Sequence, residues 1–166
     1  MSVPRNNVKI EKERISGVPF NLTNTVNSGD LLIFDTVNKV ARAAVASDQA
    51  NATSAANFIG VSNDTNPIPS IKQNLPVPRI TVITRAICLF TADDNATYFV
   101  GDAVTIGSDP QRVQKTGASG GAVIGFVAPE NFFTVTAGAS QGIVATQGVT
   151  TLLIAIKPNN TNLATI

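Results

Sequence analysis

Short apolar runs, many of them β-branched, recur along the chain and are separated by Gly, Pro, Asn, Asp and Ser. In the run Phe20–Val26, apolar and polar residues largely alternate, a period of two that is typical of a strand with one wet face. Almost nothing has helical period over a useful length, so an all-β fold is predicted. The predicted strands are Phe20–Val26, Leu31–Asp35, Val40–Ala44, Phe58–Val61, Arg79–Thr91, Tyr98–Ile106, Arg112–Lys115, Ala122–Ala128, Gly142–Ala145 and Val149–Lys157.

Three segments depart from this pattern. Arg79–Thr91 has apolar residues on both faces, which predicts a central strand covered on both sides. Ala46–Ala56 is rich in alanine and offers Ser47 or Asp48 as an N-cap, so it is the best candidate for a helix. Four prolines between Asn66 and Pro78 remove backbone donors and predict an extended loop.

A weak internal repeat runs through the chain. Gly29-Asp30 recurs 72 positions later as Gly101-Asp102, and Ile59-Gly60 recurs 65 positions later as Ile124-Gly125. The difference between these two spacings is accounted for by the predicted helix over Ala46–Ala56, which is present only in the first copy. In each Gly-Asp pair the glycine supplies the positive φ of a tight turn, and the aspartate satisfies nearby backbone donors. Two similar β units are therefore predicted.

These units define the expected domain organisation. An extended N-terminal arm over residues 1–19 precedes a single β domain over 20–166, in which the repeats cover about 26–90 and 98–157. We expect the two units to form a β-barrel or sandwich, because closure removes exposed sheet edges.

The order of the motifs resembles that of the small capsid decoration proteins of tailed bacteriophages. Gly-Asp before an apolar strand is followed by Val-x-Arg or Arg-Val, by Ile-Gly-Val or Ile-Gly-Phe-Val, and by a long Thr/Val/Ile strand, over about residues 26–157. The resemblance implies a β-barrel or β-tulip domain that forms a homotrimer on the outside of the head and acts as structural cement. It also implies an arm that reaches a neighbouring subunit or the major capsid protein. The Pro-rich loop and segment 46–56 depart from the family pattern and leave the oligomer geometry open.

Composition narrows the possible chemistry. The chain is 43% hydrophobic and only 14% charged, with a net charge of +1, which does not favour nucleic-acid binding. It has no His, so Ser-His-Asp and Cys-His mechanisms are excluded, and Cys88 is its one cysteine. No run approaches the roughly 18 apolar residues of a membrane span, and the polar start does not resemble a secretory signal. We expect no enzyme activity, no cofactor and no membrane contact.

Several motifs have ordinary structural interpretations. Asp93 and Asp94 favour a turn over a Ca²⁺ site, and Gly117–Gly121 favours a hairpin loop over a phosphate cradle. Cys88 lies on an apolar strand face and is expected to be a buried thiol. Asp30 and Asp102 resemble a catalytic carboxylate pair, but equivalent turn residues explain them better. The Asn-x-Thr triplets are best explained by chance.

The N-terminal arm carries the candidate interaction site, because apolar residues lie among its charges. A solvated tail remains the alternative to an assembly arm that adds a strand to another subunit. The candidate partner-binding residues are Arg5, Val8, Lys9, Ile10, Lys12 and Arg14.

The resemblance to decoration proteins implies a structural protein on the outer surface of a phage capsid, made in the host cytoplasm. Its expected partners are the major capsid protein and further copies of itself. The alternative is a carbohydrate-binding or receptor-binding β module of a virion fibre, although a single tyrosine and no tryptophan argue against sugar stacking.

Overall fold

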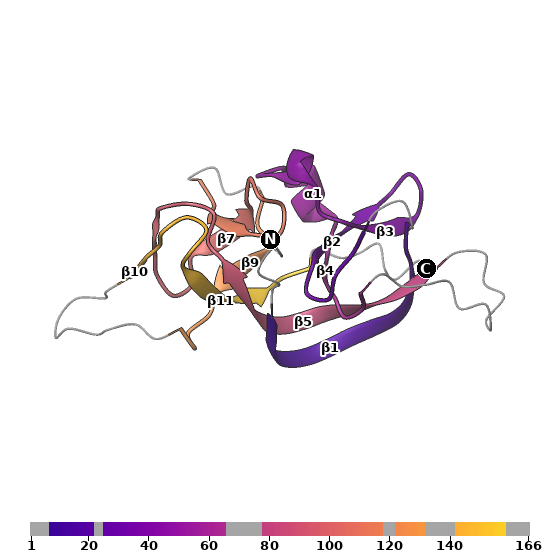
Figure 1. The fold of residues 1–166 in the computed structure, drawn as a ribbon, viewed down its shortest axis with the longest axis horizontal. Helices are drawn as coiled ribbons and strands as arrows, with labels where there is room; N and C mark the ends of the chain where they lie inside the picture. The colour runs from indigo at the N-terminus through magenta and orange to yellow at the C-terminus, as the bar shows by residue number, and fades with distance from the viewer. Residues whose placement is uncertain (1–6, 22–24, 66–77, 118–121, 132–141, 159–166) are drawn as a thin grey trace.

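The computed structural model of the protein describes residues 7–21, 25–65, 78–117, 122–131 and 142–158, with side chains in the first range from Glu13 onward. It is nearly all β, as the sequence predicts (Figure 1). The strands are β1 (Asn7–Pro19), β2 (Leu31–Asp35), β3 (Val40–Ala43), β4 (Phe58–Ser62), β5 (Arg79–Thr91), β6 (Thr97–Tyr98), β7 (Ala103–Ile106), β8 (Val113–Lys115), β9 (Gly125–Val127), β10 (Ile143–Val144) and β11 (Thr151–Ile156). Two short helices, η1 (Ala46–Asp48) and α1 (Ala52–Ala56), lie between β3 and β4.

The main sheet curls into an antiparallel half-barrel (Figure 1). Its strands follow the order β3-β2-β4-β5-β11-β9-β7-β8. β1 pairs with β5 on the other edge, since Ile83 pairs with Arg14 of β1 and with Val61 of β4. β6 and β10 form a separate two-stranded sheet. The order is symmetric about the β5/β11 pair, so β3-β2-β4-β5 and β8-β7-β9-β11 are two copies of one arrangement.

The strand register repeats as well. In the first unit Val61 pairs with Ile83, and the positions that the repeat predicts as their counterparts, Phe126 and Ala155, pair in the second. The β2/β3 and β7/β8 ladders agree in the same way, with Leu32 opposite Ala43 and Val104 opposite Lys115, in each case 72 positions apart. The sequence repeat is therefore a structural duplication at the level of individual backbone pairs.

The duplication reaches further back than the predicted repeat. Val18 pairs with Ile80 across β1 and β5, and their counterparts Phe90 and Leu152 pair across β5 and β11. The C-terminal part of β1 thus opens the first unit as the C-terminal part of β5 opens the second. β5 therefore closes one unit and opens the next.

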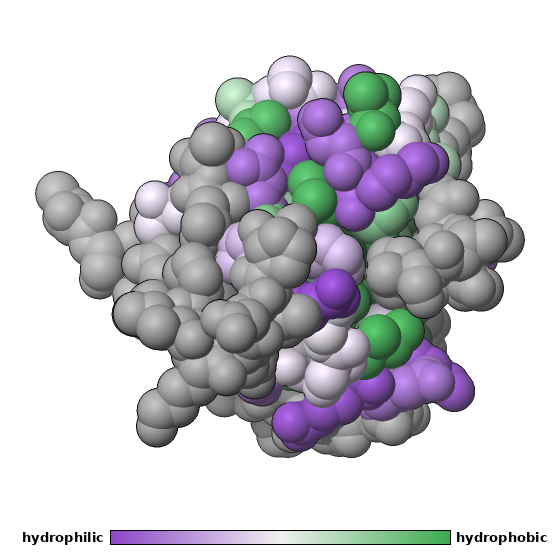
Figure 2. Space-filling model, turned by 90° about the vertical axis from the view of Figure 1, so that its right-hand side faces the viewer, coloured by the Kyte–Doolittle hydropathy of each residue, from purple (hydrophilic) through white to green (hydrophobic). Residues whose placement is uncertain are grey.

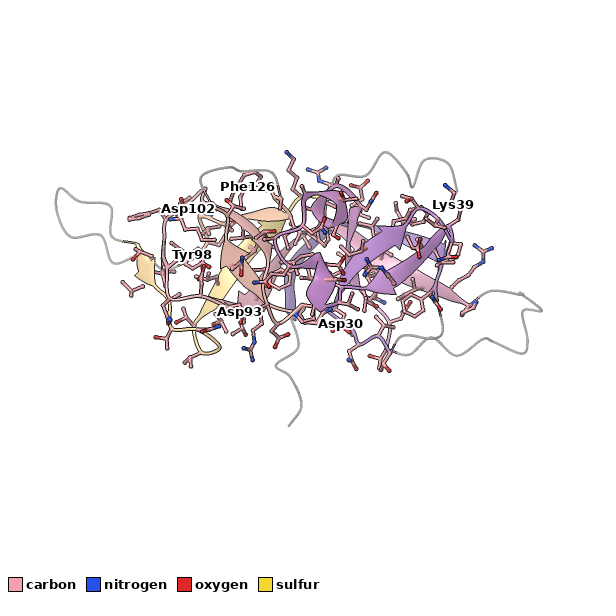
Figure 3. The ribbon with its side chains drawn as sticks, turned by 90° about the horizontal axis from the view of Figure 1, so that it is seen from above. Asp30, Lys39, Asp93, Tyr98, Asp102 and Phe126 are labelled. Carbon is pink, nitrogen blue, oxygen red and sulfur yellow. The ribbon has the colours of Figure 1, made fainter. Side chains whose placement is uncertain are left out.

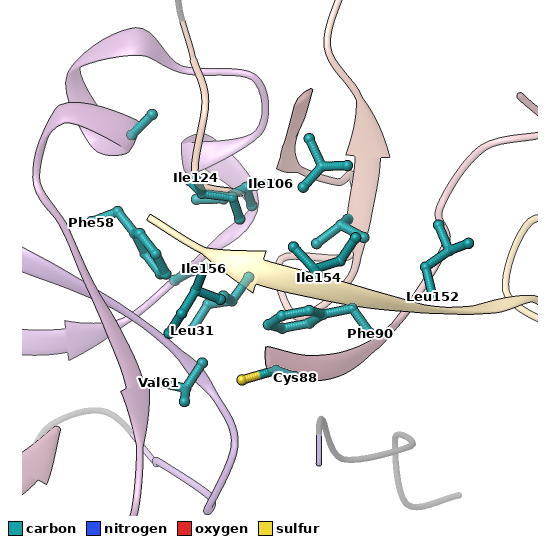
Figure 4. Packing of buried hydrophobic residues seen from close by; sticks show 14 of the residues in the cluster. Leu31, Phe58, Val61, Cys88, Phe90, Ile106, Ile124, Leu152, Ile154 and Ile156 are labelled. Atoms are coloured by element: carbon teal, nitrogen blue, oxygen red, sulfur yellow. The ribbon is translucent and has the colours of Figure 1, made fainter. Parts of the chain in front are cut away.

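Both units bury the same set of positions. The first encloses a cluster formed by Val18, Phe20, Val26, Leu32, Phe34, Ala41, Ile59, Ile80 and Val82. All nine counterparts are buried in the larger cluster and are, in the same order, Phe90, Ala92, Tyr98, Val104, Ile106, Val113, Ile124, Leu152 and Ile154. That larger cluster also takes in Leu31, Phe58 and Val61 of the first unit, so it spans both units (Figure 4).

Several predicted elements need correction. Phe20–Val26 is not a strand in its described part: Phe20 makes only an isolated bridge to Ala41. Tyr98–Ile106 is divided into β6 and β7, because Gly101-Asp102 turns the chain, and the helix predicted over Ala46–Ala56 is two short pieces. Most of the Pro-rich loop, residues 66–77, lies outside the described residues.

The N-terminal segment joins the sheet of its own chain. Residues 7–19, predicted as part of an extended arm, form β1 and pair with β5 along its length. Four register shifts interrupt this pairing, and such bulges twist and protect a sheet edge.

Candidate functional site

The predicted partner-binding residues fall on one strand. Val8, Lys9, Ile10, Lys12 and Arg14 all belong to β1, whereas Arg5 lies outside the described residues. Pairing with β5 holds β1 extended on the surface. β1 and β5 run side by side as a long two-stranded ribbon at the bottom of the view in Figure 1.

The described side chains of β1 show what this ribbon offers. Glu13, Arg14, Ile15 and Ser16 are all exposed, which places charge, polarity and one aliphatic group on an accessible strand. Glu13 lies 4.0 Å from the exposed Arg85 of β5, a separation at which a solvated ion pair contributes little. The described part of β1 is therefore an accessible strand with mixed charge.

The carboxylate of Asp48 is held by several donors of the fold. Buried Asp48 accepts two hydrogen bonds from Arg42, at 2.7 and 2.8 Å, and others from Ser54 and the Val45 N–H. Burial opposes ionisation of Asp48, but these donors outweigh it and hold the pKa of the carboxyl below its ordinary value. Asp48 therefore fastens η1 and α1 to β3.

The Asp93-Asp94 pair lies in a turn, as predicted, and its oxygens are used by protein donors. Asp93 accepts from Ser108 and the Asp109 N–H, and lies 3.6 Å from Arg112. Burial opposes ionisation of Asp93, but the hydrogen bonds lower its pKa. Within the described ranges, no three His, Cys, Asp or Glu side chains gather as a metal site would require.

A second polar cluster surrounds the one tyrosine. The buried Tyr98 hydroxyl donates to Asp94 at 2.6 Å, and burial raises the pKa of this phenol well above its ordinary value. Lys115 reaches Asp102 at 2.7 Å and the Thr97 carbonyl at 2.8 Å. The cluster ties β6 to β7 and β8.

Asp30 and Asp102 occupy equivalent turns and do not form a carboxylate pair. Each accepts a hydrogen bond from the backbone N–H three residues earlier, Asn27 at 2.7 Å and Phe99 at 2.8 Å. The two aspartates lie well apart along the molecule (Figure 3). Their turn role, predicted from the repeat, is confirmed.

Cys88 is buried, as expected, and burial raises the pKa of its thiol to about 12. A thiol with so high a pKa is a poor nucleophile near neutrality. In the part of the chain that the structure describes, no helix has the length and apolarity to span a membrane.

A group of exposed apolar residues was missed by the sequence predictions. Phe99, Val100 and Val144 are exposed on or beside β6 and β10. The signal was present in the repeat, because Asn27 and Ser28 occupy the positions of Phe99 and Val100 in the first unit.

Comparison of the chain with models of known protein families, and with curated protein sequences, finds no match.

Proposed function

We propose that the protein is a non-enzymatic decoration protein, which binds the outer surface of a phage head and stabilises it through many weak contacts. The observation that supports this best is the duplicated β body, whose repeated motifs resemble those of capsid decoration proteins. A rigid body with an accessible charged ribbon suits attachment to a protein lattice. The proposed partners are the major capsid protein and further copies of the chain, as a homotrimer.

Multivalency supplies the strength in this mechanism. Each exposed contact on β1 is individually weak, but an oligomer seated at several sites gains avidity without any strong single interaction. The low charge of the chain also makes attachment less dependent on salt. Tyr98 is buried and bonded to Asp94, so it is not free to stack on a sugar.

The direct test is stoichiometric co-sedimentation with undecorated heads of the phage that encodes the chain. Removing residues 1–6 leaves β1 whole, and Arg14→Glu reverses a charge on its exposed part. Both changes should weaken attachment, whereas Lys39→Glu, on the β2–β3 turn, should not. Failure of the wild-type protein to sediment with heads, together with capture on a glycan array, would favour the fibre module instead.

A further inference from the structure

Among the described residues, the end of the first unit shows apolar side chains only as separate spots among hydrophilic ones (Figure 2). The junction between the two units is different, because one inserted segment spans it. Residues 46–50, which are η1 and the two residues that follow it, lie within the insertion that the second unit lacks. We call residues 46–50 the strap. It lies at the top of the view in Figure 1, whereas β5 joins the units at the bottom.

The strap is firmly attached to the first unit. The carboxylate of Asp48, which is 2% exposed, accepts two hydrogen bonds from Arg42 of β3 and a third from the hydroxyl of Ser54. Charge-assisted bidentate bonds are among the strongest that side chains make. Asp48 therefore holds the strap to the first unit even when the other contacts of the strap change.

The attachment of the strap to the second unit is weaker. Gln49 donates to the side chain of Gln114 on β8 at 3.3 Å, and this bond is exposed to solvent. The N–H of Ala50 donates to the carbonyl of Ile106 at 3.2 Å. Gln114 is the counterpart of Arg42, 72 positions later, so the strap bridges equivalent places on the two units. Neutral hydrogen bonds that compete with water contribute less than the charged pair does.

A buried hydroxyl without a hydrogen-bond partner lies where the strap meets the second unit. Thr105 of β7 is 2% exposed, and its Oγ1 has no partner in the part of the chain that the structure describes. Thr105 is directly opposite Gln114 in the β7/β8 ladder, and opposite residues share a face of a sheet. The hydroxyl is therefore on the face that the strap reaches. Ile33 occupies this position in the first unit, so the fold does not require a hydroxyl there.

The strap also holds Ala50 in an unfavourable backbone conformation. Its φ of +45° lies in the left-handed region, where the Cβ of an alanine crowds the backbone. Both costs belong to the closed strap, because detachment lets water satisfy the hydroxyl of Thr105 and lets Ala50 adopt an ordinary φ. The contact with the second unit thus combines two neutral hydrogen bonds with two local penalties.

We propose that the strap is a conformational device, which detaches from the second unit while Asp48 keeps it fixed to the first. Detachment breaks the two bonds to β7 and β8, releases Ala50 from its left-handed conformation and gives water access to the hydroxyl of Thr105. The units stay together, because β5 runs through both and Gln111 still accepts from the N–H of Leu31 at 2.6 Å. The open state exposes polar groups of β7 and β8, so a partner that hydrogen-bonds them would hold the strap open. The opening does not depend on attachment to a capsid.

Native-state hydrogen exchange of the full chain, measured by NMR at several low urea concentrations, tests the opening. The protection factor of the Ala50 amide should be at least about tenfold below those of paired amides in the middle of β5. It should not change with urea, because the opening exposes little surface. An Ala50 amide that exchanges only with the urea-dependent unfolding of the whole protein overturns the proposal.

Two variants with a matched control test whether the strap is the element that opens. Thr105→Val removes the unpaired hydroxyl and should raise the protection factor of the Ala50 amide about fivefold. Gln114→Ala removes the exposed bond to the strap and should lower that protection factor severalfold. Thr84→Val makes the same change at a buried threonine of β5, whose hydroxyl bonds to Glu13, and should leave it unchanged. Equal effects of Thr105→Val and Thr84→Val, or no effect of Thr105→Val, contradict the proposal.

Discussion

Ala50 is held in a backbone conformation that suits glycine. Its φ of +45° lies in the left-handed region, and its N–H donates to the carbonyl of Ile106 across the two units at 3.2 Å. An alanine Cβ crowds the backbone in this region, whereas glycine has no Cβ. The contact between the units thus places Ala50 in a conformation unfavourable to alanine.

Ala50→Gly should therefore stabilise the protein by about 0.5–1 kcal/mol, the excess of relieved strain over the added chain entropy of glycine. Urea unfolding measures the change. Ala52→Gly, in α1, is the control and should lose stability because glycine disfavours helix. A loss of stability in both variants would show that position 50 is not strained.

Asp48 makes the stability of the folded protein depend on pH. Its pKa is lower in the folded than in the unfolded chain, so its contribution is complete above about pH 4 and is lost as pH falls through the folded pKa. Asp48→Asn should cost about 2–3 kcal/mol near neutrality and lose less further stability on acidification than wild type. Unfolding curves at neutral and strongly acidic pH measure both effects, and parallel losses would exclude this role.

At the scale of elements, two glycines mark the close approach of neighbouring strands. A Cβ on Gly60 would lie 2.2 Å from the carbonyl oxygen of Ile83, and one on Gly125 would lie 2.7 Å from that of Ala155. Ile83 and Ala155 are themselves counterparts in the repeat. The same bare backbone position is therefore required twice, between β4 and β5 and between β9 and β11.

Gly60→Ala and Gly125→Ala should each destabilise the protein by about 2–3 kcal/mol, because a backbone oxygen has nowhere to move. The effect should be larger at Gly60, where φ is also +133°. Thermal melting is the measurement. Gly117→Ala should be close to neutral, since nothing lies within 4 Å of its Cβ; an equal effect at all three positions would refute the explanation.

The elements that could be predicted are those whose signal is local. A Gly-Asp pair predicts each of the two turns, at Gly29-Asp30 and at Gly101-Asp102. The apolar residues on both faces of Arg79–Thr91 predict a strand that is covered on both sides. β1 was not predicted as a strand, because its charges obscure the alternation and its partners on β5 lie at least 60 positions away. Tyr98–Ile106 was predicted as continuous, because apolar periodicity took precedence over the turn within it.

At the scale of the whole molecule, the units cannot be separated. β5 belongs to both, and one hydrophobic cluster contains residues from each.

The candidate contact surfaces were harder to predict than this architecture, because a periodic pattern marks burial and not which apolar residues stay exposed. The repeat already set Phe99 apart from its polar counterpart Asn27, whereas Val144 was recognised as exposed only in the structure.

Because the units share β5 and one hydrophobic cluster, unfolding should be a single cooperative transition, with equal calorimetric and van't Hoff enthalpies. Ile80→Ala in the first unit and Leu152→Ala in the second occupy equivalent buried positions, and each should lower stability by about 2–5 kcal/mol without dividing the transition. Scanning calorimetry measures this. Two resolved transitions in either variant would show that the units melt independently.

The double use of β5 makes the chain extensible. Because the last strand of one unit is the first of the next, copying a stretch of 72 positions that ends within β11 would append another module with no new linker. Each added module would bring its own Gly-Asp turn, its own glycine at the close approach of two strands and its own nine core positions. The molecule is in this sense a repeat protein of two modules, and further modules could be added by design.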